Sequence, residues 1–280
     1  MAERDYNAAE FDFLDNDSMQ ELLHPPYIGD DGLLYCSKCN TPKQSRYTTE
    51  SGRECLVVID CECRQREKRA RLRRELQRGI EDERAKLATF AQDDGADSES
   101  GGMLRRYAEK WDEMQAKNIG LLLHGCVGGG KTFFAACIAN AIIDRQVEKG
   151  DWNAAPVIMT TIPALRDEMQ RDYGSKKAEV LRRIVETPLL ILDDVGYERK
   201  TSTSEELAYE IVNKRYKANK PLIVTTNLTP GEIRSAQEQN QARIFDRIVE
   251  MCSPVHIKAE GRRQAIGLAK SAEARRILGI

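Results

Sequence analysis

The sequence predicts an α/β fold in which a parallel sheet is covered by helices on both faces. Apolar runs alternate with helix-length segments from residue 104 onward, which is the pattern of parallel strands joined by crossover helices. Residues 125–132 have the sequence GCVGGGKT, and this spacing is typical of a phosphate-binding loop between a strand and a helix. The apolar run Leu189–Leu192 ends in two aspartates, and such sheets bind ligands at the carboxyl ends of their strands.

The strands and helices expected from these runs follow one another in a regular order. The expected strands are 120–124, 157–159, 189–192, 222–226 and 255–257. The expected helices are 104–118, 133–143, 163–173, 176–185, 205–217 and most of 230–249.

Each residue type of the glycine-rich loop suits the binding of phosphate. Glycines let the backbone wrap closely around phosphate oxygens, because they tolerate positive φ and have no Cβ. Lys131 is expected to reach the β- and γ-phosphates of ATP, and the Thr132 hydroxyl to ligate Mg²⁺. A chance glycine-rich turn would match these positions in only about one of a hundred chains of this length. The predicted ATP-binding residues are Gly125, Cys126, Val127, Gly128, Gly129, Gly130, Lys131, Thr132 and Asp193.

Two aspartates and one asparagine follow the later strands and are candidate catalytic residues. Asp193 is expected to hold Mg²⁺ directly or through water, and Asp194 to orient or deprotonate the attacking water. The alternative is that both acids merely end a strand. Asn227 follows the expected strand 222–226, from which its amide could touch the γ-phosphate, although asparagine at this place also commonly begins a turn.

Arg243 and Arg247 lie four residues apart on an expected helix, so they share a face. An arginine inserted from a neighbouring subunit stabilises charge on a transferred phosphoryl group. From the sequence alone, a surface pair bound to Glu238 or Asp246 is the simpler interpretation.

The composition separates acidic and basic residues along the chain. The net charge of the 280 residues is only −2, yet residues 1–35 contain nine acids and one base, and residues 64–78 contain eight bases and two acids. Such asymmetry suggests a partner-binding tail and an element that faces nucleic acid. The N-terminus has no apolar signal-peptide core, and no run approaches the roughly 18 apolar residues of a membrane span. We therefore expect a cytoplasmic protein with no membrane partner, in which disulfides are rare.

Four of the eight cysteines are spaced as metal ligands. Cys36 and Cys39 form a C-x-x-C pair, and Cys61 and Cys63 form a C-x-C pair after an expected strand. At a strand end, the period of two places both sulfurs on one face, and two such pairs make a tetrahedral Zn²⁺ site. Structural cysteines without metal are the alternative, and Cys55 could replace one ligand. We expect zinc, because so small a segment has little core without it.

Four segments are expected along the chain. Residues 1–35 form an acidic tail, which is either disordered or a docking segment that folds on a partner. Residues 36–91 contain the zinc-binding module and a basic helix at 64–87, which is either a solvated helix or a contact to DNA phosphates. Residues 92–102 form a polar linker, and residues 103–280 form the nucleotide-binding domain.

Five segments of the nucleotide-binding domain together resemble the DnaC/IstB-type AAA+ ATPases, which include replicative helicase loaders and transposition helpers. The segments are 120–132, 190–196, 213–216, 221–228 and 243–248. The likeness covers roughly residues 103–260. The loop alone is generic, whereas the paired aspartates, the Arg-Tyr at 215–216 and the Thr-Thr-Asn-Leu at 225–228 are fairly specific in combination.

The resemblance implies an AAA+ domain that binds and hydrolyses ATP at the interfaces of a homo-oligomer. It implies that Asn227 is the sensor residue and that Arg247, with Arg243 as second choice, is the arginine finger. It further implies loading of a hexameric replicative helicase onto single-stranded DNA during DNA replication. The cysteine-bearing part resembles the zinc-containing, helicase-binding domains of some loaders, so residues 1–90 are the docking candidate.

Two departures from the family pattern affect these expectations. Asp194 stands where many AAA+ proteins have Glu, and the shorter side chain predicts slow hydrolysis that depends on a partner or on DNA. After Ile257 we expect only a short basic tail, without a helical lid or a second sensor arginine. The alternatives are an IstB-like transposition helper on double-stranded DNA and an ATP-gated adaptor with little hydrolysis. A small-molecule kinase would need a substrate pocket and lid, for which the sequence offers no segment.

Overall fold

The computed structural model describes residues 24–95, 97–151, 155–171, 176–196, 202–234, 239–258 and 262–279. The chain divides into two compact units, and the boundary falls between Arg71 and Leu72. Most of the acidic tail expected at 1–35 lies outside the described residues.

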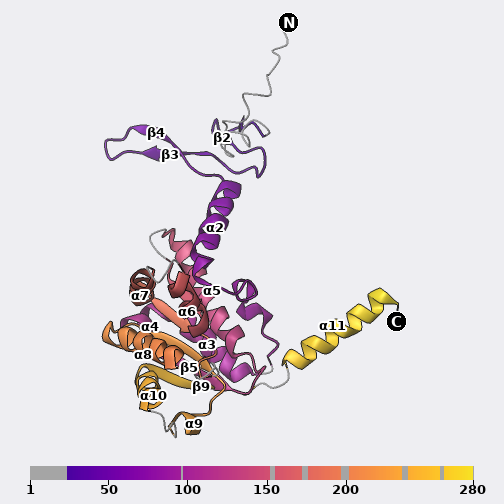
Figure 1. Cartoon of the computed structure of the whole chain (residues 1–280). Coiled ribbons are helices and arrows are strands. Elements are labelled where there is room, and N and C mark those ends of the chain that lie inside the picture. The colour runs from indigo at the N-terminus through magenta and orange to yellow at the C-terminus, as the bar shows by residue number, and fades with distance from the viewer. Residues whose placement is uncertain are drawn as a thin grey trace. The chain divides into compact units, whose positions relative to one another are not determined.

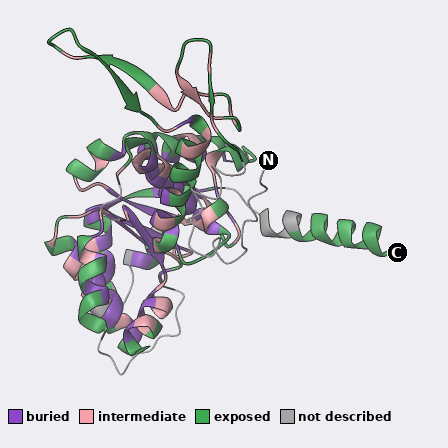
Figure 2. Ribbon diagram, turned by 90° about the horizontal axis from the view of Figure 1, so that it is seen from above, coloured by how far each residue is buried: buried purple, intermediate pink, exposed green. Residues whose placement is uncertain are grey.

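The first unit contains two small antiparallel sheets and most of a helix (Figure 1). Its elements are β1 (Tyr27–Ile28), β2 (Leu34–Tyr35), β3 (Gln44–Thr48), β4 (Glu54–Val58) and the start of α2 (Glu62–Leu76). The β3–β4 hairpin is exposed along nearly its whole length (Figure 2). Within residues 24–71, Cys61 is the one buried apolar side chain. Burial of apolar surface therefore contributes little to the stability of this unit.

The second unit is built on a five-stranded parallel sheet, as the sequence predicts. The strands are β5 (Gly120–Gly125), β6 (Val157–Thr160), β7 (Leu189–Leu192), β8 (Leu222–Thr226) and β9 (Cys252–Ile257). Their order is β6-β7-β8-β5-β9, and every neighbouring pair is parallel. The carboxyl ends of all five strands therefore lie at one edge of the sheet, where ligands of α/β proteins bind.

Helices cover both faces of this sheet. They are α3 (Ser98–Glu109), α4 (Trp111–Ala116), α5 (Lys131–Lys149), α6 (Ile162–Gln170), α7 (Lys177–Glu186), α8 (Ser202–Lys217), α9 (Pro230–Arg234) and α10 (Gln239–Met251). A last helix, α11 (Arg262–Leu278), follows the sheet in the chain, and its residues 267–278 are exposed. Leu121 and Leu123 pack in a core cluster with α3 and α5, whereas Leu122 packs in a second cluster with α6, α7, α8 and α10. This alternation buries the strands from both sides, which explains their continuous apolar runs. Among the described helices, none is long and apolar enough to cross a membrane.

The expected basic helix at 64–87 is wrong in its length, because α2 ends at Leu76. Beyond a short 3₁₀ turn, the chain extends along the edge strand β6, where Ile80 forms a parallel bridge with Met159. A Cβ on Gly79 would lie 2.2 Å from the Val157 carbonyl oxygen, so this close approach requires glycine. Leu72, Leu76 and Ile80 are all buried in the core of the second unit. These three residues, spaced four apart in the sequence, thus form an apolar stripe that belongs to the core and continues past the end of α2.

Three other expectations also need correction. The expected linker at 92–102 includes the start of α3, which Asp97 caps by accepting a hydrogen bond from the Ser100 amide. The expected helix at 104–118 is interrupted at Lys110 and forms α3 and α4. The expected short tail after Ile257 contains the 17-residue helix α11. The sequence did not reveal these boundaries, since they depend on caps and single residues.

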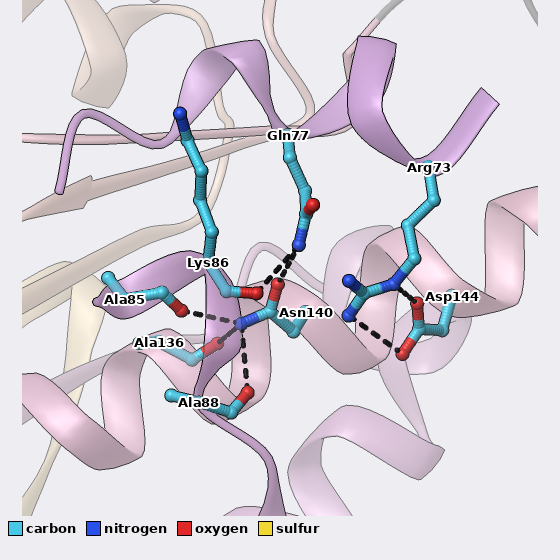
Figure 3. Close-up of polar contacts among 8 residues, drawn as sticks. All are labelled: Arg73, Gln77, Ala85, Lys86, Ala88, Ala136, Asn140 and Asp144. Atoms are coloured by element: carbon cyan, nitrogen blue, oxygen red, sulfur yellow. Dashed lines mark hydrogen bonds and ion pairs between the residues drawn. The ribbon is translucent and has the colours of Figure 1, made fainter. Parts of the chain in front are cut away.

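A buried polar network fastens residues 77–88 to α5 (Figure 3). The Asn140 amide donates to the carbonyl oxygens of Ala85, Ala88 and Ala136 at 2.7, 2.9 and 3.1 Å. Its side-chain oxygen accepts a hydrogen bond from Gln77 Nε2 at 2.8 Å. Asn140 is 1% exposed, so these bonds satisfy groups that water does not reach.

We expect Asn140→Leu to lower the free energy of unfolding by roughly 2–4 kcal/mol, because each buried polar group left without a partner costs about 1–3 kcal/mol. Asp144→Ala is the matched control on the same helix. It removes only a half-exposed ion pair with Arg73, which contributes about 0–1 kcal/mol. Urea titration followed by circular dichroism measures both variants. Equal losses in the two would contradict a stabilising role for the buried network.

Candidate functional site

The glycine-rich loop at 125–132 turns from β5 into α5. Gly128 and Gly130 have φ of 81° and 101°, a conformation that residues with a Cβ rarely adopt. Gly130 directly precedes the 19-residue helix α5, whose N-terminal dipole and free N–H groups attract phosphate. The Lys131 ammonium donates to the carbonyl oxygens of Gly125 and Cys126 at 3.0 and 2.8 Å. The lysine is therefore held against the loop, where phosphate oxygens could replace these carbonyl partners.

The carboxylate of Asp193 joins three elements at the carboxyl edge of the sheet. Its Oδ1 atom accepts hydrogen bonds from the hydroxyls of Thr132 and Thr225, at 3.0 and 2.5 Å. Burial raises the pKa of Asp193, and the bonds from Thr225 and Thr132 oppose this rise. Mg²⁺ prefers oxygen ligands from carboxylates, hydroxyls and water. The side chains of Asp193 and Thr132 fit such an ion beside the loop.

Asp194 and Asn227 are in direct contact. The Asn227 amide donates to Asp194 Oδ1 at 3.2 Å. Asp194 has a φ of 60°, and its backbone N–H donates to the Thr225 hydroxyl at 2.8 Å. This arrangement places a carboxylate and an amide side by side next to the candidate Mg²⁺ ligands, where they are able to bind and orient a water molecule.

A buried arginine braces the segments that lead into β7 and β8. Arg215 is fully buried, and its guanidinium donates to the carbonyl oxygens of Ile184, Thr187 and Pro188 at 3.1, 2.6 and 3.1 Å. It also donates to the Pro221 carbonyl oxygen. Burial lowers the pKa of Arg215 to about 10. The arginine of the Arg-Tyr pair seen in the sequence thus fastens α8 to the segments that lead into β7 and β8.

The two arginines of α10 lie in different surroundings. Arg243 is exposed, whereas the Arg247 guanidinium lies over the rings of Tyr209 and Tyr216 in α8, at 4.9 and 5.8 Å from the ring centroids. Neither arginine pairs with Asp246 in the described part of the chain, and Glu238 lies outside it. The simple surface pair weighed from the sequence is therefore not seen with Asp246.

Four sulfurs gather in the first unit. The Sγ atoms of Cys36, Cys39, Cys61 and Cys63 all lie within 4.8 Å of one another, and the Cys36–Cys63 and Cys61–Cys63 distances are 3.7 and 3.3 Å. A tetrahedral ion at about 2.3 Å from each sulfur holds the sulfurs about 3.8 Å apart. Burial and the neighbouring sulfurs raise the pKa of Cys63 to about 12, so four thiolates here require a cation. The donor set therefore fits zinc.

Two details of the cysteine prediction change. Cys61 directly precedes α2 and Cys63 lies in its first turn, not at a strand end as expected, because Ile59 and Asp60 separate β4 from Cys61. Cys55 is exposed on β4 and does not belong to the cluster.

Sequence reasoning gave no role to Thr225, although its hydroxyl binds both Asp193 and the Asp194 amide. The alternation of side-chain direction along β8 could have identified Thr225. Residues two apart in a strand share a face, and Thr225 precedes Asn227 by two positions. No local sequence pattern predicts the stacking of Arg247 on Tyr209 and Tyr216, because this contact joins two separate helices, α8 and α10.

The sheet order, the loop and the Asp193 cluster define a P-loop protein of the AAA+ class. The chain belongs to the family of IstB-like ATP binding proteins, which matches residues 43–268. ATP binding is thus a property of the family, and the expected AAA+ fold is confirmed.

Similar proteins include replication and insertion-sequence proteins. The replicative helicase loader DnaI of Bacillus subtilis is 27% identical over 190 residues, which cover 63% of this chain and 58% of that protein. A Mycobacterium tuberculosis protein, named as an ATP-binding protein in an insertion sequence, is 30% identical over 132 residues, which cover 47% of this chain and 49% of that protein. The chain thus spans about half the length of these relatives.

Solved structures agree on the fold. The crystal structure of DnaI has a TM-score of 0.52 and 25% identity, and covers 67% of this chain and 99% of that chain. The crystal structure of the DnaC helicase loader has a TM-score of 0.51 and 24% identity, and covers 63% of this chain and 100% of that chain.

We expect Cys39→Ser to reduce bound zinc from about one ion per chain to well below that, because a four-sulfur site loses a ligand. Cys55→Ser is the matched control and should leave the metal content unchanged, since Cys55 lies outside the cluster. Metal analysis of both purified proteins by mass spectrometry measures the difference. Zinc-free wild-type protein, isolated without chelators, would remove the basis for a zinc centre.

Proposed function

We propose that this protein is an ATP-dependent loader that places a hexameric replicative helicase onto single-stranded DNA. The observation that favours a loader is the small cysteine-bearing unit that precedes the AAA+ domain. This unit exposes large apolar side chains on the β3–β4 hairpin and beside it, namely Tyr47, Leu56, Val57, Val58 and Ile59. Exposed apolar surface of this kind is typical of a protein-docking site. The similarity to helicase loaders supports the same proposal.

In this proposal ATP binds between protomers of a homo-oligomer. Lys131 binds the β- and γ-phosphates, and Thr132 and Asp193 hold Mg²⁺, which neutralises charge on the phosphates. Asp194 and Asn227 orient the attacking water, and Arg247 reaches the γ-phosphate of the neighbouring protomer. Because Asp194 is shorter than Glu, we expect slow hydrolysis that accelerates with the helicase or DNA.

The basic helix is the proposed contact to DNA phosphates. Arg66, Arg69 and Arg71 are exposed, and none forms an ion pair in the described part of the chain. Other bases of α2 are already paired, since Lys68 binds Asp60 and Arg73 binds Asp144. Unpaired arginines are the stronger candidates, because they do not give up a protein partner when they bind DNA.

A second candidate function is that of a transposition helper on double-stranded DNA. The match to an insertion-sequence ATP-binding protein favours it, as does the family itself. An ATP-gated adaptor with little hydrolysis uses the same site and differs only in turnover.

Light scattering coupled to size-exclusion chromatography tests the loader proposal. We expect the full chain, with ATP, to form a stoichiometric complex with the replicative helicase of its own host. Leu56→Lys with Val58→Lys should abolish the complex, because two charges oppose burial of the hairpin. Arg53→Ala is the control, since it changes the turn of the same hairpin without touching its apolar residues. Separate elution with both ATP and ADP would reject the loader and favour assembly on double-stranded DNA.

The role of α2 is tested by the salt dependence of single-stranded DNA binding. We expect Arg66→Gln, Arg69→Gln and Arg71→Gln together to reduce the slope of log K against log salt by about 2, since each lost phosphate contact contributes about 0.7. Lys68→Gln is the control on the same helix, because its ammonium already binds Asp60. An unchanged slope in the triple variant would assign the helix to protein contacts.

A further inference from the structure

The side chain of Arg247 lies on an aromatic surface made by α8. Its guanidinium carbon is 4.9 Å from the ring centroid of Tyr209 and 5.8 Å from that of Tyr216. These tyrosines are seven residues apart, so they lie on one face of the helix, and α8 packs against α10. A side-chain hydrogen bond with Arg247 and the charge of its guanidinium lower the pKa of Tyr209. Two rings of one helix thus fix an arginine of another.

This environment holds the cation without neutralising it. Within the described residues, no carboxylate lies at ion-pair distance from Arg247, and its Nη1 atom is buried without a hydrogen-bond partner. Aromatic faces attract a guanidinium but offer few acceptors for its N–H groups. A planar guanidinium that no carboxylate neutralises is suited to two-point recognition of phosphate oxygens.

Tyr216 also binds an acid that is spaced to pair with Arg247. Glu250 lies three positions after Arg247 on α10, a spacing at which opposite charges pair on a helix. Its Oε1 atom instead accepts a hydrogen bond from the Tyr216 hydroxyl at 2.8 Å. The tyrosine therefore supplies a ring to the arginine and engages the nearby carboxylate.

We infer that Tyr209 and Tyr216 are positioning residues for the arginine finger, which keep the Arg247 guanidinium oriented and its charge available to a neighbouring protomer's ATP. The inference rests on the proposed role of Arg247. Tyr209 acts through its ring face and through its side-chain hydrogen bond with Arg247. Tyr216 acts through its ring and by holding Glu250 away from the arginine.

Steady-state ATPase assays test this, with the full chain under conditions in which the wild-type oligomer turns over. Arg247→Ala should lower kcat by about a thousandfold, the lower end of the range for arginine fingers. Tyr209→Ala should lower kcat about tenfold with the KM for ATP unchanged, because the nucleotide site of its own protomer is intact. Tyr209→Phe should recover part of this loss, because the ring remains although the hydroxyl that bonds Arg247 is lost. Val249→Ala, an exposed change on α10, is the control and should match wild type.

The role given to Glu250 has its own test. Tyr216→Phe retains the ring and frees the Glu250 carboxylate. This carboxylate should then pair with Arg247 for part of the time, so kcat should fall about fivefold. Adding Glu250→Gln should restore it, because the amide has no charge to pair. A loss in Tyr216→Phe that Glu250→Gln does not restore would reject this part of the inference.

A mixing experiment separates positioning of the finger from general damage to the protein. Tyr209→Ala protomers retain an intact ATP site, and Asp194→Ala protomers retain an intact finger. Mixed oligomers should therefore turn over faster than oligomers of either variant alone, because some of their sites combine an intact Asp194 with an intact finger. If Arg247→Ala lowers kcat but the tyrosine variants equal wild type, the tyrosine inference is wrong and the finger proposal stands. If Arg247→Ala equals wild type, the finger proposal itself fails, and the inference fails with it.

Discussion

The hydrogen bonds to Asp193 are the interaction on which the candidate site depends. One carboxylate oxygen accepts from Thr132 at the start of α5 and from Thr225 in β8. Three segments that are distant in the sequence thereby meet at one atom. Parallel pairing of β7 with β8 and of β8 with β5 brings these strand ends into line. The buried Arg215 stabilises the opposite ends of two of these strands, because it binds the carbonyl groups that precede β7 and β8.

The segment that leads into the AAA+ domain is part of its core. Leu72, Leu76 and Ile80 are buried there, and Asn140 binds the turns that follow α2. The Glu81 amide donates to the Met159 carbonyl oxygen, and the Thr160 hydroxyl donates to the Glu81 carboxylate. This pairing covers an edge strand whose open backbone groups would otherwise be free to join another chain.

The two units are stabilised in different ways. The sheet unit buries continuous apolar runs on both faces of its strands. The cysteine unit has a single buried apolar side chain within residues 24–71, and a two-stranded hairpin is at best marginally stable by itself. A metal held by the four sulfurs would offset the missing core, because ion binding would then contribute directly to folding. Little of its apolar surface is used inside the unit, so much of it remains available to a partner.

The sequence by itself determined the parallel sheet, the phosphate-binding loop and the four clustered cysteines. These features depend on local patterns, namely buried strands, glycine positions and short ligand spacings. The tertiary structure alone decided that α2 ends at Leu76, that Thr225 binds Asp193, and that Arg247 lies on Tyr209 and Tyr216. Each of these depends on contacts between segments far apart in the chain, and no local pattern encodes which residues will meet across a packed core.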